Sequence, residues 1–530
     1  MQNVLESLSK ADLIALIEQR EMLIQQKDFT IQRMDSTIQE LGASIQDKET
    51  QIAKLQRMLY GQKRERFTKS PIQLPLDFGQ QLSQQEIKEI EELINTKAQV
   101  HKEDLAKQPR QPHPGRSPLP KHLAVEEIVI EPVEDTTGMV LMGQEVSDSL
   151  QYVPSRFYIQ RIIRPKYIKP AQSIDQVPSF AIAALPQSAF GKCMAGAGLI
   201  AQMLIDKFWD HLPLYRQQQR FKREGIDIAA STIDHWVKLG MQRIELLYEY
   251  QKRLVLHSPY LQVDETVIKV QDHQNKSGKT HQGYFWAYHD PVGKQTFFKY
   301  EPTRAGAYPT AMLKDFTGYL QTDGYGGYGA VAQRENIVHL ACWAHTRRKF
   351  EEALSHDKVM AETAMVLIQE LYAVERQAKD QNRSGGRLDI DQIKELRLEK
   401  SLPKYNLLGK WISSNMPKVL PKSPIGAAFR YAFERWDELG HYMYDGRLQI
   451  DNNWVENAIR PIAIGRKNFL FAGSHEGAQR AAIMYTFADQ CKRHNQDPHQ
   501  WLKHVFENIL DTKPSQYHSL LPQNHISQRF

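Results

Sequence analysis

Paired cysteines and long apolar runs are missing from this chain of 530 residues. Its three cysteines, Cys193, Cys342 and Cys491, lie far apart, and no Cys-x-x-Cys pair occurs. This scarcity excludes a disulfide framework and a cysteine-rich zinc site, and it favours a reducing cytoplasm as the setting. No stretch approaches the roughly 18 apolar residues of a membrane span, and residues 1–10 carry no export signal. A membrane partner is therefore not expected.

A strong charge of either sign is also absent. The formal net charge is +6 and the isoelectric point is near 8.8, which permits a polyanionic partner without requiring one. At about 150 residues per domain, the length predicts three or four domains. The local grouping of cations is therefore more informative than their total.

An apolar residue recurs at every seventh position from Ile17 to Leu59. This repeat predicts a coiled coil over residues 1–60 that pairs subunits into a homo-oligomer. The companion register is apolar at only four of its seven positions, so a lone helix packed on the body of the protein remains an alternative.

Residues 61–120 are basic and rich in proline, which predicts a linker with one short helix over 84–96. Its cations are candidate contacts for DNA phosphates, with simple solvation as the alternative: Lys63, Arg64 and Arg66. Residues 121–185 contain alternating or β-branched runs over 125–130, 151–157 and 158–167, which predict a small β module.

Residues 186–250 change to helical periodicity. Helices are predicted over 198–209, 213–223 and 231–240, the last capped by Ser231-Thr232 after a glycine turn at 225–227. This outline is typical of a DNA-binding helix-turn-helix, although an ordinary helical bundle has the same pattern.

Strands and helices then alternate in the order of a ribonuclease H-like α/β core over residues 251–348. The predicted elements are strands over 261–270, 284–288, 296–300 and 318–322, a helix over 310–315 and a further strand over 339–345. Residues 349–440 predict a helical insertion with a break at 384–386, residues 441–486 close the core, and residues 487–530 form a helical tail. The expected fold is multidomain and mainly α, with an N-terminal coiled coil and a catalytic core interrupted by the insertion.

Three acids stand out in this core: Asp264 and Asp323 on hydrophobic strands, and Glu456 on a short amphipathic helix. Three converging carboxylates can hold two divalent cations about 3.5 to 4 Å apart, and oxygen ligands favour Mg²⁺ or Mn²⁺. Asn453, Glu456 and Arg460 share one helical face, which is expected to point inward. The sequence thus predicts the core of a metal-dependent nuclease or transposase.

The neighbours of these acids allow several interpretations. Glu265 is expected to be a surface or supporting acid because alternation points it to the opposite strand face. Asp451 is expected to cap the helix rather than act as the third ligand, while His345 contacts phosphate, orients the site or is structural. Trp454 and Phe471 are assigned to packing rather than base stacking. Phosphate contact, with surface solvation as the alternative, is assigned to Arg347, Arg348, Lys349, Arg460, Arg466 and Lys467.

Several segments together resemble the transposases of bacterial insertion-sequence family sixty-six, and the resemblance covers nearly the whole chain. They are Arg57-Met-Leu-Tyr-Gly61, His211-Leu-Pro-Leu-Tyr-Arg216, Arg223-Glu-Gly225, Tyr-Leu-Gln-Val-Asp264-Glu-Thr, Asp323-Gly-Tyr, Cys342-Trp-Ala-His345-x-Arg-Arg-Lys-Phe350, Gly446-Arg-Leu-Gln-Ile-Asp-Asn-Asn-x-x-Glu456-Asn-x-Ile-Arg-Pro461 and Ile464-Gly-Arg-Lys-Asn-x-Leu-Phe-Ala-Gly473. The motif around Glu456 is the most specific.

The resemblance implies a DDE-type enzyme that binds the terminal inverted repeats of its own mobile element and cuts and joins their ends to target DNA. Its catalytic triad maps onto Asp264, Asp323 and Glu456. It also implies companion proteins encoded beside it and a location on the bacterial nucleoid.

One departure concerns zinc. Family members commonly carry a cysteine-based zinc finger before the catalytic domain, whereas residues 131–186 contain no cysteine. Zinc is therefore not expected, and recognition of the terminal repeats then rests on the β module, the helix-turn-helix or both. Two alternatives to a transposase remain: a non-catalytic DNA-binding oligomer, and a ribonuclease H-like nuclease without strand transfer.

Overall fold

The computed structural model describes residues 27, 82–106, 157–169, 179–182, 188–191, 193–272, 280–383 and 388–525. The predicted coiled coil, the basic cluster at 63–66 and most of the predicted β module lie outside these residues. The chain divides into two compact units. The smaller comprises Met1–Ile90, Lys349–Leu367 and Pro403–Glu434, and the larger comprises Glu91–Arg348, Ile368–Leu402 and Arg435–Phe530.

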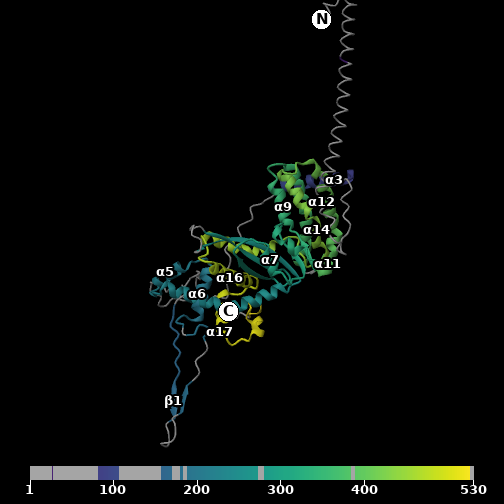
Figure 1. Cartoon of the computed structure of the whole chain (residues 1–530). Coiled ribbons are helices and arrows are strands. Elements are labelled where there is room, and N and C mark those ends of the chain that lie inside the picture. The colour runs from purple at the N-terminus through teal and green to yellow at the C-terminus, as the bar shows by residue number, and fades with distance from the viewer. Residues whose placement is uncertain are drawn as a thin grey trace, which may run out of the picture. The chain divides into compact units, whose positions relative to one another are not determined.

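A mixed five-stranded sheet forms the centre of the larger unit (Figure 1). Strands β3 (Tyr260–Val270), β4 (His281–Asp290) and β5 (Gln295–Glu301) form an antiparallel meander. Strands β6 (Gly318–Gln321) and β7 (Ile337–Leu340) add to the other edge of β3 in parallel, giving the order β5-β4-β3-β6-β7. The strands predicted over 261–270, 284–288, 296–300 and 318–322 are confirmed.

Apolar side chains cover both faces of this sheet. Tyr288 and Phe297, on one face, belong to a core shared with α4 (Ala197–Phe208), α6 (Ala230–Leu256) and α17 (Pro498–Asn508). On the opposite face, the core residues come from β3, β4, β5, α15 (Asn453–Asn468) and α16 (His475–Arg493). Because helices cover both faces, the central strands are buried almost continuously instead of alternating.

The three helices predicted before the sheet are present as α4, α5 (Leu214–Arg223) and α6. The third is much longer than predicted because its later turns bury Met241, Ile244 and Leu247 in the core beneath the sheet. The predicted Ser231-Thr232 cap is wrong: Ala229 occupies the cap position and makes no side-chain cap bond.

Two strand predictions are also wrong. Residues 157–165 contain no regular structure, and the described part of this region forms only the hairpin β1 (Lys166–Lys169) and β2 (Ser179–Ile182). The strand predicted over 339–345 ends at Leu340, and α9 (Trp343–Glu352) begins soon after it. The prediction failed because the apolar residues of 339–345 are equally typical of a buried strand and of the buried start of a helix over so short a run.

The stretch predicted to be helical after the sheet is mainly helical in its described residues, with turns over 353–357 and 419–423. Its helices are α10 (Lys358–Arg383), α11 (Ile390–Leu396), α12 (Leu402–Asn415), α13 (Pro424–Glu434) and α14 (Trp436–Gly440). Shorter helices α7 (Ala307–Met312) and α8 (Gly329–Ala332) lie between the strands. Within the described part of the chain, none of the helices is long and apolar enough to cross a membrane.

The described residues of the smaller unit form an aromatic core. The ring of Phe429 on α13 packs edge-on against Phe350 and at a tilt against Trp411. The helix predicted over 84–96 is confirmed and continues as α3 (Gln84–Ala106), and Glu86 at its start accepts a hydrogen bond of 2.8 Å from Lys410.

Within the larger unit, Arg397 ties the helical stretch to the chain that leads into α15. Its guanidinium donates two hydrogen bonds of 2.8 Å to Glu375 and further bonds of 2.9 to 3.0 Å to the carbonyl oxygens of Tyr442, Asp445 and Leu448. Arg397 opens a π-helical turn (Arg397–Ser401), and its side chain is only 3% exposed. A buried charge of this kind is stable because every guanidinium donor direction meets an oxygen.

A second buried network fixes the residues just before α15 to the sheet. Gln262 on β3 donates through Nε2 to the Oε1 of Gln321 on β6 at 2.8 Å and to the carbonyl oxygen of Asp451 at 2.9 Å. Gln321 donates in turn to the carbonyl oxygen of Gln449 at 2.9 Å, and Asn452 donates to that of Val263 at 3.2 Å. These bonds hold residues 449–452 across the ends of two parallel strands.

We expect Gln262→Met to lower the melting temperature of the protein. The substitution removes a buried donor from the carbonyl oxygen of Asp451, and an unsatisfied buried group costs about 1–3 kcal/mol. Circular dichroism during heating measures the change. Gln282→Met, at an exposed position of β4, is the matched control and should melt like the wild type. Equal melting of the two variants would contradict a structural role for the network.

Candidate active site

Asp264 lies on β3, and Asp323 lies at the equivalent position two residues beyond the end of the adjacent parallel strand β6. The pentapeptides Tyr-Leu-Gln-Val-Asp264 and Tyr-Leu-Gln-Thr-Asp323 pair residue for residue up to Gln262 and Gln321. Each aspartate follows its paired glutamine by two residues. The parallel register of the two strands therefore brings both acids to the same end of the strand pair. Their carboxylate oxygens, with one from Glu265, lie within 4.8 Å of one another.

The environment of Asp264 opposes negative charge. Burial, followed by the charges of Glu265 and Asp323, raises the pKa of Asp264 well above its usual value, and Glu456 adds to the same effect. One hydrogen bond from the N–H of Glu265 to Oδ1, at 2.8 Å, works in the other direction. The charges of Asp323 and Glu456 therefore both act on the carboxyl of Asp264, although the three acids come from three elements. The ligand atom of Glu456 belongs to a different close group from those of Asp264 and Asp323.

Glu265 is not a surface acid, because its side chain is only 2% exposed. Arg304 donates to its Oε1 at 2.6 Å, and the hydroxyl of Tyr328 donates to its Oε2 at 2.6 Å. Arg304 also lies 4.0 Å from Asp323 and stacks over the ring of Tyr325. These contacts favour the alternative of a supporting acid. The role of Arg304 was missed because nothing in the residues around it signals a site.

Glu456 reaches the site from the first turn of α15, which begins directly after the anchored residues 449–452. The prediction that Asp451 caps the helix is wrong, because Asn452 occupies the cap position and makes no side-chain cap bond. Asp451 lies one residue earlier and accepts hydrogen bonds from the backbone and side-chain nitrogens of Asn453. The helix N-terminus favours a negative charge in its first turn.

The prediction that Asn453, Glu456 and Arg460 face inward is wrong. Asn453 and Arg460 are exposed and Glu456 is half-buried. The buried face of α15 consists instead of Val455, Ala458, Ile459 and Ile462, which pack on the sheet. The acid therefore lies at the border between the core and solvent, where a large substrate can reach it.

A second group of possible ligands surrounds Glu456. One ligand atom each from Cys342, His345 and Glu456 lies within 4.8 Å of the others, and Nδ1 of His345 is 3.8 Å from Oε1 of Glu456. Burial raises the pKa of the Cys342 thiol to about 12, and its sulfur accepts a hydrogen bond from the N–H of Asn452. Cys342 thus helps to anchor the start of α15, while His345 places a basic side chain beside the acid.

The site fits hard divalent cations. The ligand atoms of Asp264, Glu265 and Asp323 are all carboxylate oxygens, which Mg²⁺ and Mn²⁺ prefer. Oε1 of Glu456 is buried and has no hydrogen-bond donor among the residues that the structure describes. A divalent cation bound among the oxygens of Asp264, Glu265 and Asp323 would offset the repulsion between these carboxylates.

The cations predicted to contact DNA have different surroundings. Arg348 is 52% exposed and lies 3.7 Å from Glu456, whereas Lys349 pairs with Glu352 at 2.8 Å. Arg466 donates to the carbonyl oxygen of Val267 at 2.7 Å. The remaining described members of the set are solvent-exposed: Arg347, Arg460 and Lys467.

Comparison with known proteins identifies the family. Residues 192–480 match the family described as "Transposase IS66 family", residues 49–128 match "Transposase C of IS166 homeodomain", and residues 489–523 match "IS66 C-terminal element". The first match alone spans more than half of the chain and contains all three acids. The chain belongs to the IS66 family of transposases, which confirms the resemblance seen in its sequence.

Similar proteins occur in Sinorhizobium fredii (strain NBRC 101917 / NGR234). "Uncharacterized protein y4hP" is 29% identical over 89% of this chain and 88% of its own length. "Uncharacterized protein y4qI" is 32% identical over 78% of each chain, and "Uncharacterized protein y4jD" is 27% identical over 90% of this chain and 94% of its own length.

We expect Asp264→Asn to raise the melting temperature when EDTA keeps divalent cations away. A pKa raised by folding means that the charged carboxylate destabilises the folded state, so wild-type stability falls as the pH rises through the raised pKa. Each tenfold change in an acid dissociation constant corresponds to about 1.4 kcal/mol. Melting curves at acidic and alkaline pH check this: the wild type should lose stability between them through this group, whereas Asp264→Asn should not.

Asp315→Asn provides the control, because the side chain of Asp315 is 87% exposed. It should melt like the wild type at every pH. Added Mg²⁺ should raise the melting temperature of the wild type and of Asp315→Asn but not that of Asp264→Asn. A destabilised Asp264→Asn in EDTA would contradict the electrostatic account.

Proposed function

We propose that this transposase is a DDE-type enzyme that binds the terminal inverted repeats of its insertion sequence and catalyses metal-dependent DNA cleavage and strand transfer. The observation that supports it most is the equivalent placement of Asp264 and Asp323 relative to the paired parallel strands β3 and β6, with Glu456 close enough to raise the pKa of Asp264. The mixed sheet of meander and parallel strands agrees with a ribonuclease H-like core.

In this proposal, Asp264, Asp323 and Glu456 are the residues that would hold two Mg²⁺ or Mn²⁺ ions. The ions, when bound, promote in-line displacement at phosphorus by stabilising the attacking and leaving oxygens. Glu265 supports the site through its bonds to Arg304 and Tyr328, which partly offset the effect of burial in raising the pKa of its carboxyl.

The chain's cations position DNA around this centre. Arg348 is exposed beside Glu456 and can turn to a phosphate oxygen without leaving a buried partner unpaired. Arg460 and Lys467 present charge to solvent from the same helix as Glu456. Their contacts with phosphate are independent of base sequence, so they favour DNA as a class of substrate rather than one site.

The reaction proposed has two steps. Water first cuts the phosphodiester at the element end, and the freed 3′-hydroxyl then attacks a phosphodiester of target DNA, releasing the other strand end as a new 3′-hydroxyl. Pairing of subunits through residues 1–60 would bring two element ends together, with companion proteins of the same element as further partners. The bacterial cytoplasm, on the nucleoid, is the proposed location.

We expect Asp264→Asn, Asp323→Asn and Glu456→Gln each to lower cleavage by about a hundredfold or more, since removal of one group that stabilises developing charge costs about 10²–10³ in rate. A labelled duplex from the end of the element is incubated with Mg²⁺ or Mn²⁺, and products are separated on a denaturing gel. Binding to the same duplex in EDTA should persist.

Asp315→Asn is the matched control and should cleave at the wild-type rate. Normal cleavage by any of the three variants would refute the assignment of that acid. Binding by the wild type without cleavage would favour a non-catalytic DNA-binding oligomer. Cleavage without joined products, when a target plasmid is present, would favour a nuclease without strand transfer.

A further inference from the structure

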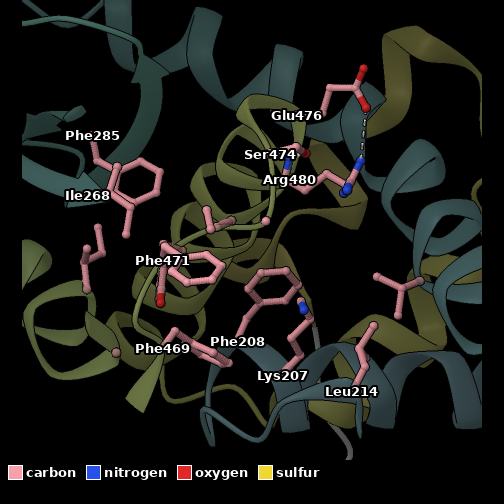
Figure 2. Close-up of a pocket in the computed structure, with 18 of the residues that line it drawn as sticks. Lys207, Phe208, Leu214, Ile268, Phe285, Phe469, Phe471, Ser474, Glu476 and Arg480 are labelled. Atoms are coloured by element: carbon pink, nitrogen blue, oxygen red, sulfur yellow. Dashed lines mark hydrogen bonds and ion pairs between the residues drawn. The ribbon is translucent and has the colours of Figure 1, made fainter. Parts of the chain in front are cut away.

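A cavity of about 390 Å³ lies within the larger unit (Figure 2). Its walls come from the helices α4, α5 and α6, the strands β3 and β4, and the chain from α15 to α16. This volume lies in the range of small-ligand sites. None of the residues assigned to catalysis above lines it, so the cavity has no role yet.

Aromatic rings and cationic side chains together line this cavity. Figure 2 shows the rings of Phe208, Phe469 and Phe471 gathered around its centre, with the amino group of Lys207 beside them. Lys207 lies 5.6 Å from the ring centre of Phe208 and 6.0 Å from that of Phe469. Phe471 is 40% exposed, so its assignment to packing alone does not account for its position.

Lys207 lacks a close anionic partner. The nearby carboxylate of Asp234 pairs with Lys238 at 2.8 Å, and Glu476 lies 3.8 Å from Arg480. Among the described residues, no carboxylate lies within ion-pair distance of Lys207, and burial together with the charge of Arg480 lowers its pKa. An anion in the cavity would offset both effects, which favours a ligand with a phosphate over a purely apolar one.

The cavity also lies along the same elements as the acids. Ile268 in its wall follows Asp264 by four residues on β3, which is ~13 Å along an extended strand. Arg466 follows Glu456 by ten residues on α15, which is ~15 Å along the helix axis. At about 3.4 Å per nucleotide along one duplex strand, these distances correspond to only a few nucleotides.

We infer that this cavity binds one unstacked nucleotide of the DNA substrate a few positions from the cleaved phosphate. The base would stack on Phe471 and Phe469, and its phosphate would lie near Lys207 and Arg480. This inference rests on the proposed action on DNA, and it adds a site where a nucleotide outside the duplex is held. Aromatic stacking of this kind accepts any base, so the site fixes strand position rather than sequence.

Two single strands of equal length test the inference: a fluorescent oligothymidylate, and the same backbone with abasic sites in place of its bases. Binding of the full-length protein is measured by fluorescence anisotropy in EDTA, which prevents cleavage. Phe471→Ala should weaken binding of oligothymidylate about tenfold while leaving the abasic strand unchanged, because only the first strand can stack. Lys207→Met should weaken both strands, since it removes a phosphate contact.

The matched control is Leu470→Ala, because Leu470 is 80% exposed, adjoins Phe471 and is absent from the cavity wall. It should bind both strands like the wild type. Lys207→Met keeps the length of the side chain and removes a half-buried charge, so it should fold, and circular dichroism checks this. Equal binding of oligothymidylate by Phe471→Ala and the wild type would overturn the inference, as would an equal loss in Leu470→Ala.

Failure of this inference can be told apart from failure of the proposed function. A wild type that cleaves element ends but shows no dependence on Phe471 would remove the nucleotide site alone. Base-dependent binding that is lost in Phe471→Ala, in a protein that never cleaves DNA, would support the site and refute the enzyme. Loss of self-association in Phe471→Ala at unchanged affinity for oligothymidylate would assign the cavity to a protein side chain instead.

Discussion

The arrangement of the three acids depends on buried amide hydrogen bonds between the sheet and the residues that precede α15. Gln262 and Gln321 lie opposite each other on parallel strands and donate to carbonyl oxygens of Asp451 and Gln449, far along the chain. Each buried donor or acceptor would be costly if left unpaired, so loss of one of these bonds weakens the attachment of residues 449–452 to the sheet. The same pair of glutamines thereby aligns Asp264 with Asp323 and sets where the helix carrying Glu456 begins.

The acids of the site differ in whether a cation of the protein lies beside them. This difference indicates where positive charge from a bound ion would act. Arg304 pairs with Glu265 and Arg348 lies beside Glu456, yet no described cation pairs with Asp264. Burial and three neighbouring acids raise the pKa of that carboxyl. Divalent cations would supply positive charge at the position where the protein supplies none, which couples the stability of the core to the ions that the proposed chemistry needs.

The sequence predicted the sheet and its acids because hydrophobic, β-branched runs are strong local signals. It could not predict the inward face of α15, since Glu456 and Arg460 share a helical face whichever way that face points, and only packing on the sheet decides. The strand expected up to His345 failed for a related reason: its apolar residues are buried at the start of a helix. Tertiary contacts of Glu265, with Arg304 and Tyr328, leave no trace in local periodicity.

Arg397 connects the helical stretch between Asp323 and Glu456 to the peptide that leads into α15, so this stretch is more than an addition to the surface. Its side chain binds Glu375 on one side and three carbonyl oxygens of residues 442–448 on the other. A segment inserted into a fold is often pictured as an exchangeable cassette whose excision leaves the host intact. Here excision would remove the Arg397 guanidinium, which binds three carbonyl oxygens of the peptide leading to Glu456. A chain shortened to a minimal catalytic core at that point would therefore need a replacement for these buried hydrogen bonds.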